Sequence, residues 1–123
     1  MNGYFDIALN LASDRFLGDR KKVITNAISH DVNYFNIVCS SIDELDFVKD
    51  LNSRFRENSC FTLGVHPHNA NELNEDNLQS LKDSIKMHHP SAVGETGLDF
   101  FRNLSSFECQ LNAFEPVSYT HLT

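Results

Sequence analysis

Four short apolar segments alternate with four segments of helical periodicity along this chain of 123 residues. The apolar segments are YFDIALNL (4–11), YFNIVCS (34–40), CFTLGV (60–65) and SAVGETGL (91–98). The helical segments cover residues 20–29, 41–55, 77–89 and 105–115. Short strands that alternate with helices are typical of a parallel sheet with crossover helices. We therefore predict an α/β fold of about four parallel strand–helix units.

The segment 41–55 has the clearest helical pattern. Its apolar residues form one stripe, which consists of Leu45, Val48, Leu51 and Phe55. Ser41 and Glu44 stand before this stripe at the spacing of a capping box. Ser105 and Glu108 repeat that spacing at the start of the last helical segment. We expect both helices to begin at these serines.

Size and charge limit the classes of protein that this chain can belong to. A chain of 123 residues is long enough for one domain with a core, and 41% of its residues are hydrophobic. Its net charge of −7 argues against a broad basic face for nucleic acid. A bound metal ion could still supply positive charge locally, so the charge does not exclude a phosphate ligand.

The cysteines and the N-terminal residues indicate a reducing compartment. The three cysteines are widely spaced, odd in number and without a CxxC pattern. The first residues, MNGYFDIALNL, lack a basic region before their apolar part and so do not resemble a signal peptide. No apolar run approaches the roughly 18 residues that span a bilayer. We expect a cytoplasmic protein without membrane contact.

Polar residues lie at or near the carboxyl ends of the predicted strands. Those of interest are Asp6 and Asn10 in the first strand segment, His66 and His68 after the third, and Glu95 and Asp99 after the fourth. In parallel α/β folds, ligands bind at the carboxyl ends of the strands. We expect these side chains to gather on one rim of the sheet.

Glu95 is the best candidate metal ligand from the residues alone. It stands between two glycines in VGETGLDF (93–100), directly after an apolar strand. A buried carboxylate there requires a cation or another partner, and carboxylates suit Mg²⁺ and Mn²⁺. A carboxylate that caps the following turn, or that pairs with an arginine, would give the same pattern.

His66 and His68 form a second candidate site. Their spacing on an extended segment directs both side chains to the same side, and Pro67 between them ends the strand ladder. Such a pair can bind a metal, donate hydrogen bonds to a phosphate, or transfer protons near neutral pH. A solvated turn without chemical function would also fit these residues.

Three segments together resemble the TatD family of metal-dependent deoxyribonucleases, in the amidohydrolase superfamily. They are FDIALNL, LGVHPHNA and AVGETGLDFFRN, in matching order and spacing. The resemblance implies the N-terminal half of a TIM-like (β/α) barrel. It also implies hydrolysis of DNA phosphodiesters, as an exonuclease on single-stranded ends. The implied cofactor is a divalent cation, with Mg²⁺ expected and Mn²⁺ or Zn²⁺ as alternatives.

The resemblance also assigns roles to residues. Glu95 matches the metal-binding glutamate of the family, and His66 and His68 match its histidine pair, for which we expect phosphate contact or support of the site. Asp99 matches the aspartate of the same motif, where we expect a supporting role at the rim. Many relatives carry a metal-binding His-x-His in the first strand, whereas this chain has Ala8 and Asn10 there. This difference leaves fewer ligands for a first metal, with Asp6 and Asn10 as the remaining candidates.

The resemblance covers about half of a barrel, which needs eight strands. We expect residues 1–115 to form a partial TatD-like domain and residues 116–123, PVSYTHLT, to be a non-native or irregular tail. His121 in that tail is then not a ligand. The family's remaining metal-binding histidines and its catalytic aspartate would lie beyond these segments, so we expect weak activity or none. Two alternatives remain open, namely an amidohydrolase-like enzyme for esters or amides, and a half-barrel without catalysis.

Overall fold

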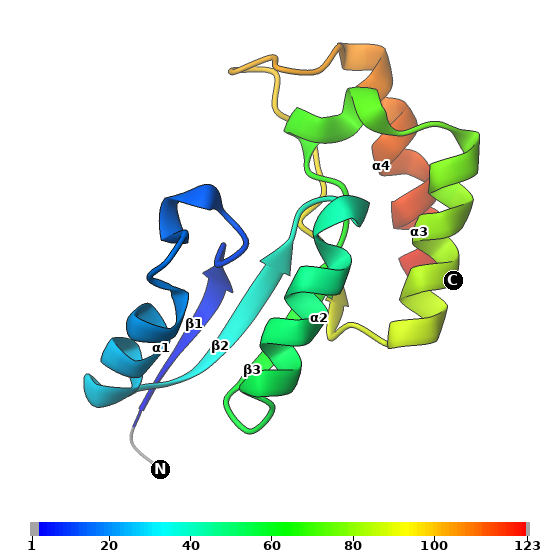
Figure 1. The fold of residues 1–123 in the computed structure, drawn as a ribbon. Coiled ribbons are helices and arrows are strands. Elements are labelled where there is room, and N and C mark those ends of the chain that lie inside the picture. Colours follow the sequence, from blue (N-terminus) through cyan, green and yellow to red (C-terminus); the bar gives the residue numbers. More distant parts are fainter. Residues whose placement is uncertain (1–2, 123) are drawn as a thin grey trace.

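The computed structural model describes the backbone of residues 3–122 and the side chains of residues 3–119 (Figure 1). The strands of this part are β1 (Tyr4–Leu9), β2 (Val32–Cys39), β3 (Ser59–Leu63) and β4 (Ala92–Val93). The α-helices are α1 (Arg20–Ser29), α2 (Leu45–Arg54), α3 (Glu75–His88) and α4 (Phe107–Leu122). Short 3₁₀ helices cover η1 (Asp14–Phe16), η2 (Ile42–Glu44) and η3 (Pro67–Glu72). The predicted α/β alternation is confirmed.

In the described residues, the four strands form one sheet in the order β1-β2-β3-β4, and every neighbouring pair is parallel. The register between β2 and β3 is regular, with Cys39 opposite Leu63. Leu63 in turn lies opposite Val93 of β4. The carboxyl ends of β2, β3 and β4 therefore meet at one edge of the sheet, as Figure 1 shows. Residues that follow these strands enter the same region of space.

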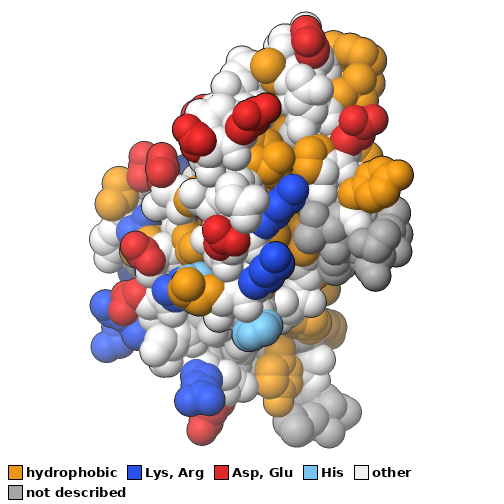
Figure 2. Space-filling view, turned by 90° about the vertical axis from the view of Figure 1, so that its right-hand side faces the viewer, with side chains coloured by type: hydrophobic (Ala, Val, Ile, Leu, Met, Phe, Trp, Pro, Cys, Tyr) orange, Lys and Arg blue, Asp and Glu red, His pale blue; other side chains and the backbone are white. Residues whose placement is uncertain are grey.

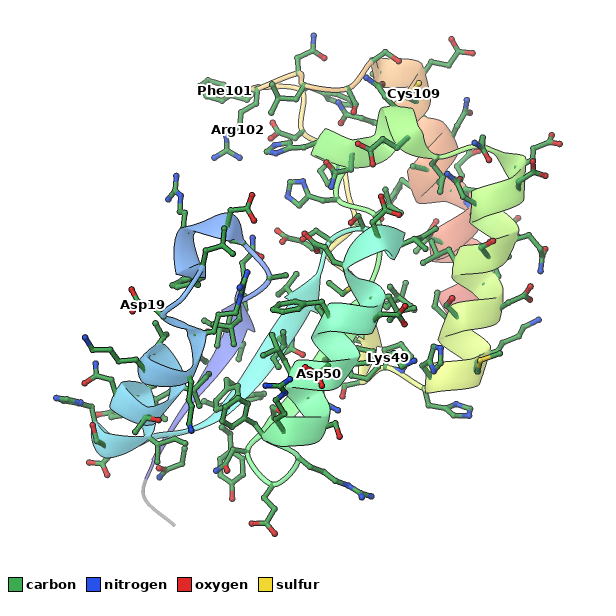
Figure 3. All side chains as sticks on the ribbon, viewed as in Figure 1. Asp19, Lys49, Asp50, Phe101, Arg102 and Cys109 are labelled. Atoms are coloured by element: carbon green, nitrogen blue, oxygen red, sulfur yellow. The ribbon has the colours of Figure 1, made fainter. Side chains whose placement is uncertain are left out.

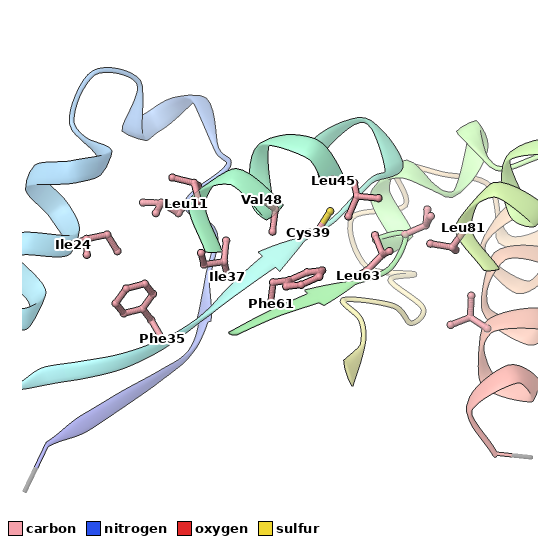
Figure 4. Packing of buried hydrophobic residues seen from close by; sticks show 13 residues of the cluster. Leu11, Ile24, Phe35, Ile37, Cys39, Leu45, Val48, Phe61, Leu63 and Leu81 are labelled. Carbon is pink, nitrogen blue, oxygen red and sulfur yellow. The ribbon is translucent and has the colours of Figure 1, made fainter. Parts of the chain in front are cut away.

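The core lies between the sheet and its helices (Figure 4). Alternate residues of β2 and β3 point into it, because successive side chains of a strand face opposite sides. Its fully or almost fully buried members include Ile24, Phe35, Ile37, Cys39, Val48, Phe61, Leu63 and Leu81. These residues come from α1, α2, α3 and two strands, so one cluster joins the sheet to three helices.

The predicted capping box at the start of α2 is wrong. Ser41 makes no side-chain cap, and Glu44 instead accepts a hydrogen bond on Oε2 from the backbone N–H of Ser40, at 2.9 Å. A short 3₁₀ turn separates Ser41 from the α-helix, so the helical spacing does not hold there. A reciprocal box does form at α3, between Asn74 and Asn77, a pair of residues that the sequence pattern did not reveal.

The predicted cap of α4 is displaced by one residue. Ser106 accepts a hydrogen bond from the backbone N–H of Cys109 at 3.2 Å and therefore caps the helix. The hydroxyl of Ser105 donates instead to the carbonyl oxygen of His68, at 2.9 Å. Ser105 is buried because it joins two segments far apart in sequence, and it is unavailable to the helix.

Two boundaries differ from the prediction. The fourth strand covers only Ala92–Val93, because the chain leaves the ladder after Gly94, whose N–H donates to the carbonyl of Leu63. The tail from residue 116 is not irregular, since α4 continues to Leu122 and the apolar side chain of Val117 is buried against the core. The non-native origin of these residues remains a prediction. The side chain of His121 lies outside the described residues.

Charged side chains of both signs are scattered over the face that carries α3 (Figure 2). The helix contributes Glu75, Asp76, Lys82, Asp83 and Lys86 to this mixture. The basic side chains do not gather into one patch on the face shown, in keeping with the net charge of −7. None of the helices in residues 3–122 combines the length and apolar composition needed to cross a membrane.

The central position of Leu63 leads to a stability prediction. Leu63 is fully buried between β2, β4 and the helices, so Leu63→Ala should lower the free energy of unfolding by about 2–5 kcal/mol. Met87 on α3 is 71% exposed, and Met87→Ala should change stability by less than about 0.5 kcal/mol. Urea denaturation followed by circular dichroism measures both. Equal losses for the two variants would contradict this assignment of the core.

Candidate functional site

A hollow of about 340 Å³ opens at the carboxyl edge of the sheet. The residues that line it are Asn10, Ser40, Glu44, His66, His68, Asn69 and Glu95. They follow four different strands, and all seven are polar. The parallel order of the strands thus brings together four of the residues that sequence reasoning selected, namely Asn10, His66, His68 and Glu95.

Asp6 is not among the residues that line this hollow, and its selection as a site position is not supported. It lies inside β1, before the carboxyl end of the strand, and it is exposed. Its Oδ1 accepts a hydrogen bond from the backbone N–H of Ala8, at 3.1 Å. Within β1 and the residue that follows it, only Asn10 reaches the hollow, because only Asn10 lies beyond the last residue of the strand.

Glu95 reaches the hollow because two backbones come unusually close. A Cβ added at Gly64 would lie 2.8 Å from the carbonyl carbon and 2.9 Å from the Cα of Gly94. Only glycine at position 64 permits this approach, which sets the position of the next residue, Glu95. The Glu95 side chain is 59% exposed, and its Oε1 lies 3.6 Å from Nε2 of His66.

His66 has a fixed orientation at the start of η3. Its Nδ1 accepts a hydrogen bond from the backbone N–H of His68 at 3.2 Å, so the proton of the neutral ring lies on Nε2, the atom nearest to Glu95. Burial lowers the pKa of His66, while the Glu95 carboxylate opposes that effect and His68 adds to it. A pKa below the ordinary value favours the neutral ring at neutral pH.

His68 and Asp99 form the shortest side-chain contact at the site. Nε2 of His68 lies 2.8 Å from Oδ2 of Asp99. The backbone N–H groups of Phe101 and Arg102 donate to Oδ1 of the same carboxylate. The Arg102 backbone N–H above all, and then the hydrogen bond from His68, lower the pKa of Asp99 to about 2.

An ionised Asp99 determines the state of its partner. A carboxylate can only accept hydrogen bonds, so Nε2 of His68 must carry the proton in their 2.8 Å contact. The neutral His68 ring then has its lone pair on Nδ1. The two imidazole rings contact each other edge to face, with centroids 4.2 Å apart. Each ring therefore has a defined tautomer, fixed by a neighbour within the site.

Sequence reasoning missed two residues behind the rim, Ser105 and Gln110. Both are almost completely buried, and Gln110 accepts a hydrogen bond from the backbone N–H of Asp99 at 2.7 Å. A signal for Gln110 was present in the sequence. It lies three and seven residues before Ala113 and Val117, which are also buried, so it is a polar residue on the apolar face of α4.

The donor atoms of the described residues do not form a complete metal site. Among residues 3–119, no group of three histidine, cysteine, aspartate or glutamate side chains is arranged to hold a metal ion. Glu95 offers an open carboxylate, but Nδ1 of His66 and Nε2 of His68 are engaged in hydrogen bonds. These residues alone do not fit a cation, which would need further ligands. The metal role of Glu95 remains a prediction.

The fold and its rim define the class of protein. The structure resembles that of a hydrolase of the TatD family from Entamoeba histolytica, with a TM-score of 0.87 and 24% sequence identity. The similarity covers 98% of this chain and 46% of that one. The four strand–helix units are therefore half of a TIM-like barrel, as predicted.

Sequence comparison identifies the family. The family model of the TatD related DNases matches residues 5–118, so this chain belongs to the TatD DNase family. A "3'-5' ssDNA/RNA exonuclease TatD" of Pantoea ananatis is 37% identical over 111 residues, which are 90% of this chain and 43% of the relative. A protein of the same name from Dickeya dadantii is 34% identical, with 89% and 42% covered. The chain spans less than half the length of these relatives.

The contact between Gly64 and Gly94 leads to a prediction about the rim. Gly64→Ala would place a methyl group against backbone atoms that cannot rotate away, so β4 must move. We expect a loss of thermal stability, together with shifted amide NMR signals at Glu95 and His66. Signals of α1, which packs beside β1 and β2 and away from β4, should stay in place. An unchanged spectrum at Glu95 would show that the contact does not position this residue.

The pKa of Asp99 predicts a pH dependence of stability. Because the folded-state pKa is about 2 and the ordinary value is 3.8, the carboxylate stabilises the fold fully above pH 3.8 and loses this effect as the pH falls towards 2. Asp99→Asn should therefore reduce stability at pH 6 and flatten the dependence between pH 4 and 2. Asp46→Asn, at a carboxylate that is 99% exposed, is the matched control and should leave the dependence unchanged. Denaturant titrations at several pH values distinguish the two variants.

Proposed function

We propose that this half-barrel carries part of the active site of a metal-dependent exonuclease that hydrolyses phosphodiester bonds at the ends of single-stranded DNA. The observation that carries the proposal is the hollow lined by Glu95, His66 and His68 in a chain of the TatD DNase family. A carboxylate and two histidines at the ends of parallel strands are suited to bind and orient a phosphodiester.

The substrate class is taken from the relatives. The proteins of Pantoea ananatis and Dickeya dadantii are named as 3′-5′ exonucleases of single-stranded DNA or RNA. We extend this activity to the present protein, with removal of nucleotides from the 3′ end of DNA as the first choice and RNA as a second substrate. The net charge of −7 favours binding at a local site over a broad basic face.

The proposed cofactor is a divalent cation, Mg²⁺ in the first place, with Mn²⁺ and Zn²⁺ as alternatives. Glu95 is the residue of this chain that would hold it, because its carboxylate is half exposed in the hollow and makes only a long contact with His66. When bound, such an ion would supply Lewis acidity to the phosphodiester. Its other ligands would come from outside the described residues.

The two histidines would orient the phosphate. With Nε2 bound to Asp99, His68 can carry a further proton on Nδ1, and that N–H would donate to a phosphate oxygen while the Asp99 carboxylate faces the positive ring. His66 keeps its proton on Nε2, next to Glu95. In this proposal Asp99 fixes the tautomer of His68 and does not contact the substrate.

A half-barrel with little or no catalysis is the second candidate for the 123-residue chain by itself. It is favoured by the lack of a three-ligand cluster among the described residues and by the coverage of only 42–46% of the relatives. A third possibility, hydrolysis of small esters or amides, uses the same hollow. The cytoplasm remains the proposed compartment, since all three cysteines are unpaired thiols.

The test completes the barrel with a related sequence. Residues 1–115 are joined to the part of the Pantoea ananatis relative that this chain does not cover. We expect Mg²⁺-dependent release of nucleotides from 5′-labelled single-stranded DNA. Because Glu95 is the proposed ligand, Glu95→Gln should lower kcat/KM by about 100-fold. Gel electrophoresis of the products measures the rate and the polarity of removal.

Three controls make this test decisive. Glu57→Gln changes an exposed carboxylate between α2 and β3, at the opposite edge of the sheet, and should leave the rate unchanged. The 123-residue chain alone should show little or no hydrolysis. A panel of small esters should not be turned over. Full activity of the Glu95→Gln chimera would refute the metal role, and turnover of esters without DNA hydrolysis would refute the nuclease.

A further inference from the structure

We propose that Gln110 of α4 is a positioning residue that holds the His68–Asp99 pair from behind the rim. The side-chain amide of Gln110 binds the backbone of Asp99 on both sides and is joined to His68 through Ser105. Its importance for the reaction rests on the proposed function, whereas its structural part can be tested without any activity.

The side-chain amide of Gln110 makes two hydrogen bonds to the backbone of Asp99. Oε1 accepts a hydrogen bond from the Asp99 N–H at 2.7 Å, and Nε2 donates to the Asp99 carbonyl oxygen at 3.1 Å. Nε2 also donates to the carbonyl oxygen of Ser105, at 2.8 Å. The amide oxygen of Gln110 thus meets one backbone N–H donor. Its NH₂ group meets two backbone carbonyl acceptors.

This matching leaves the amide one orientation. A rotation by 180° would place N–H against N–H and oxygen against carbonyl oxygen. Gln110 is 1% exposed, so water cannot replace the lost partners. The Gln110 side chain therefore has one orientation. Its hydrogen bonds fix the two peptide groups on either side of the Asp99 Cα.

Ser105 connects the same amide to His68. Its hydroxyl donates to the carbonyl oxygen of His68 at 2.9 Å and accepts from the backbone N–H of Asn71 at 3.2 Å. Ser105 is 2% exposed. Gln110 therefore binds Asp99 directly and is linked to His68 through Ser105. It thereby keeps His68 and Asp99 at the distance of their 2.8 Å contact.

The loop beyond Asp99 explains why such a support is needed. Phe101 and Arg102 lie at its tip and project away from the body of the molecule (Figure 3), where Phe101 is 97% exposed. Packing at the tip therefore contributes little to the position of Asp99. The buried contacts of this segment lie at its base, and Gln110 supplies them.

The test is Gln110→Met, which keeps the length of the side chain and removes the amide. NMR of the labelled 123-residue protein provides two readouts, the ¹³C titration of the Asp99 carboxyl and the imidazole Nε2–H signal of His68. We expect the pKa of Asp99 to rise from about 2 towards 3.8, and the His68 signal to be lost to exchange. A folded Gln110→Met protein with both readouts unchanged would overturn the proposal.

Two further variants complete the test. Gln110→Leu also removes the amide without adding a charge, should raise the pKa of Asp99 as Gln110→Met does, and serves if the methionine variant does not fold. Ser105→Ala removes the hydroxyl bonds to the His68 carbonyl oxygen and from the Asn71 N–H, but keeps the Ser105 carbonyl that Gln110 binds. It should weaken the His68 signal while the Asp99 pKa moves less than in Gln110→Met. A Ser105→Ala protein with an unchanged His68 signal would overturn the second link.

Asn58→Ala is the control for general destabilisation. The Asn58 amide donates to the carbonyl of Asn33 at 2.8 Å, at the amino end of β2 and therefore at the opposite end of the strand from the rim. We expect a lower melting temperature with both readouts intact. If Asn58→Ala changes them as Gln110→Met does, the effect is not positional and the proposal fails. Nuclease assays of the chimera are separate, so a failed nuclease assignment leaves these readouts interpretable.

Discussion

The parallel pairing of β2, β3 and β4 is the constraint on which the site depends. It delivers every strand end to the same edge, so residues separated by dozens of positions in the sequence line one hollow. In this arrangement Gly64 and Gly94 come so close that no side chain would fit at position 64. The distances between the strand backbones thus determine where the site residues lie. The side chains of the strands mainly form the core.

Much of the fold could be predicted because it follows from periodicity. The stripe of Leu45, Val48 and Leu51 is buried, and α1 has the predicted bounds. Helix starts were less predictable, because a serine hydroxyl can bind either the backbone of its own helix or groups elsewhere in the fold. Ser105 binds the His68 carbonyl, a partner that only the tertiary structure brings near.

The candidate site likewise has residues that could be predicted from the sequence and residues that could not. His66, His68 and Glu95 could be selected from the sequence, since each lies within five residues of the end of a strand and the strand order fixes their meeting place. Asp6 lies within β1 and does not line the hollow, so its role at the site stays a prediction. The spacing of Gln110 to Ala113 and Val117 marks it as a buried polar residue of α4, but not its role at the site, because its partners are backbone groups that carry no sequence signal.

Two carboxylates of the rim, Glu95 and Asp99, are held by different parts of the molecule. Glu95 follows from the contact between strands, whereas Asp99 depends on a helix and a buried amide. Elements secured by separate contacts can open separately in a native protein. The rim therefore consists of two local units of stability, and a fluctuation that releases Asp99 and frees His68 can leave Glu95 in place. Hydrogen exchange would record such a rim as two rates, one for the strand ends and another for the loop.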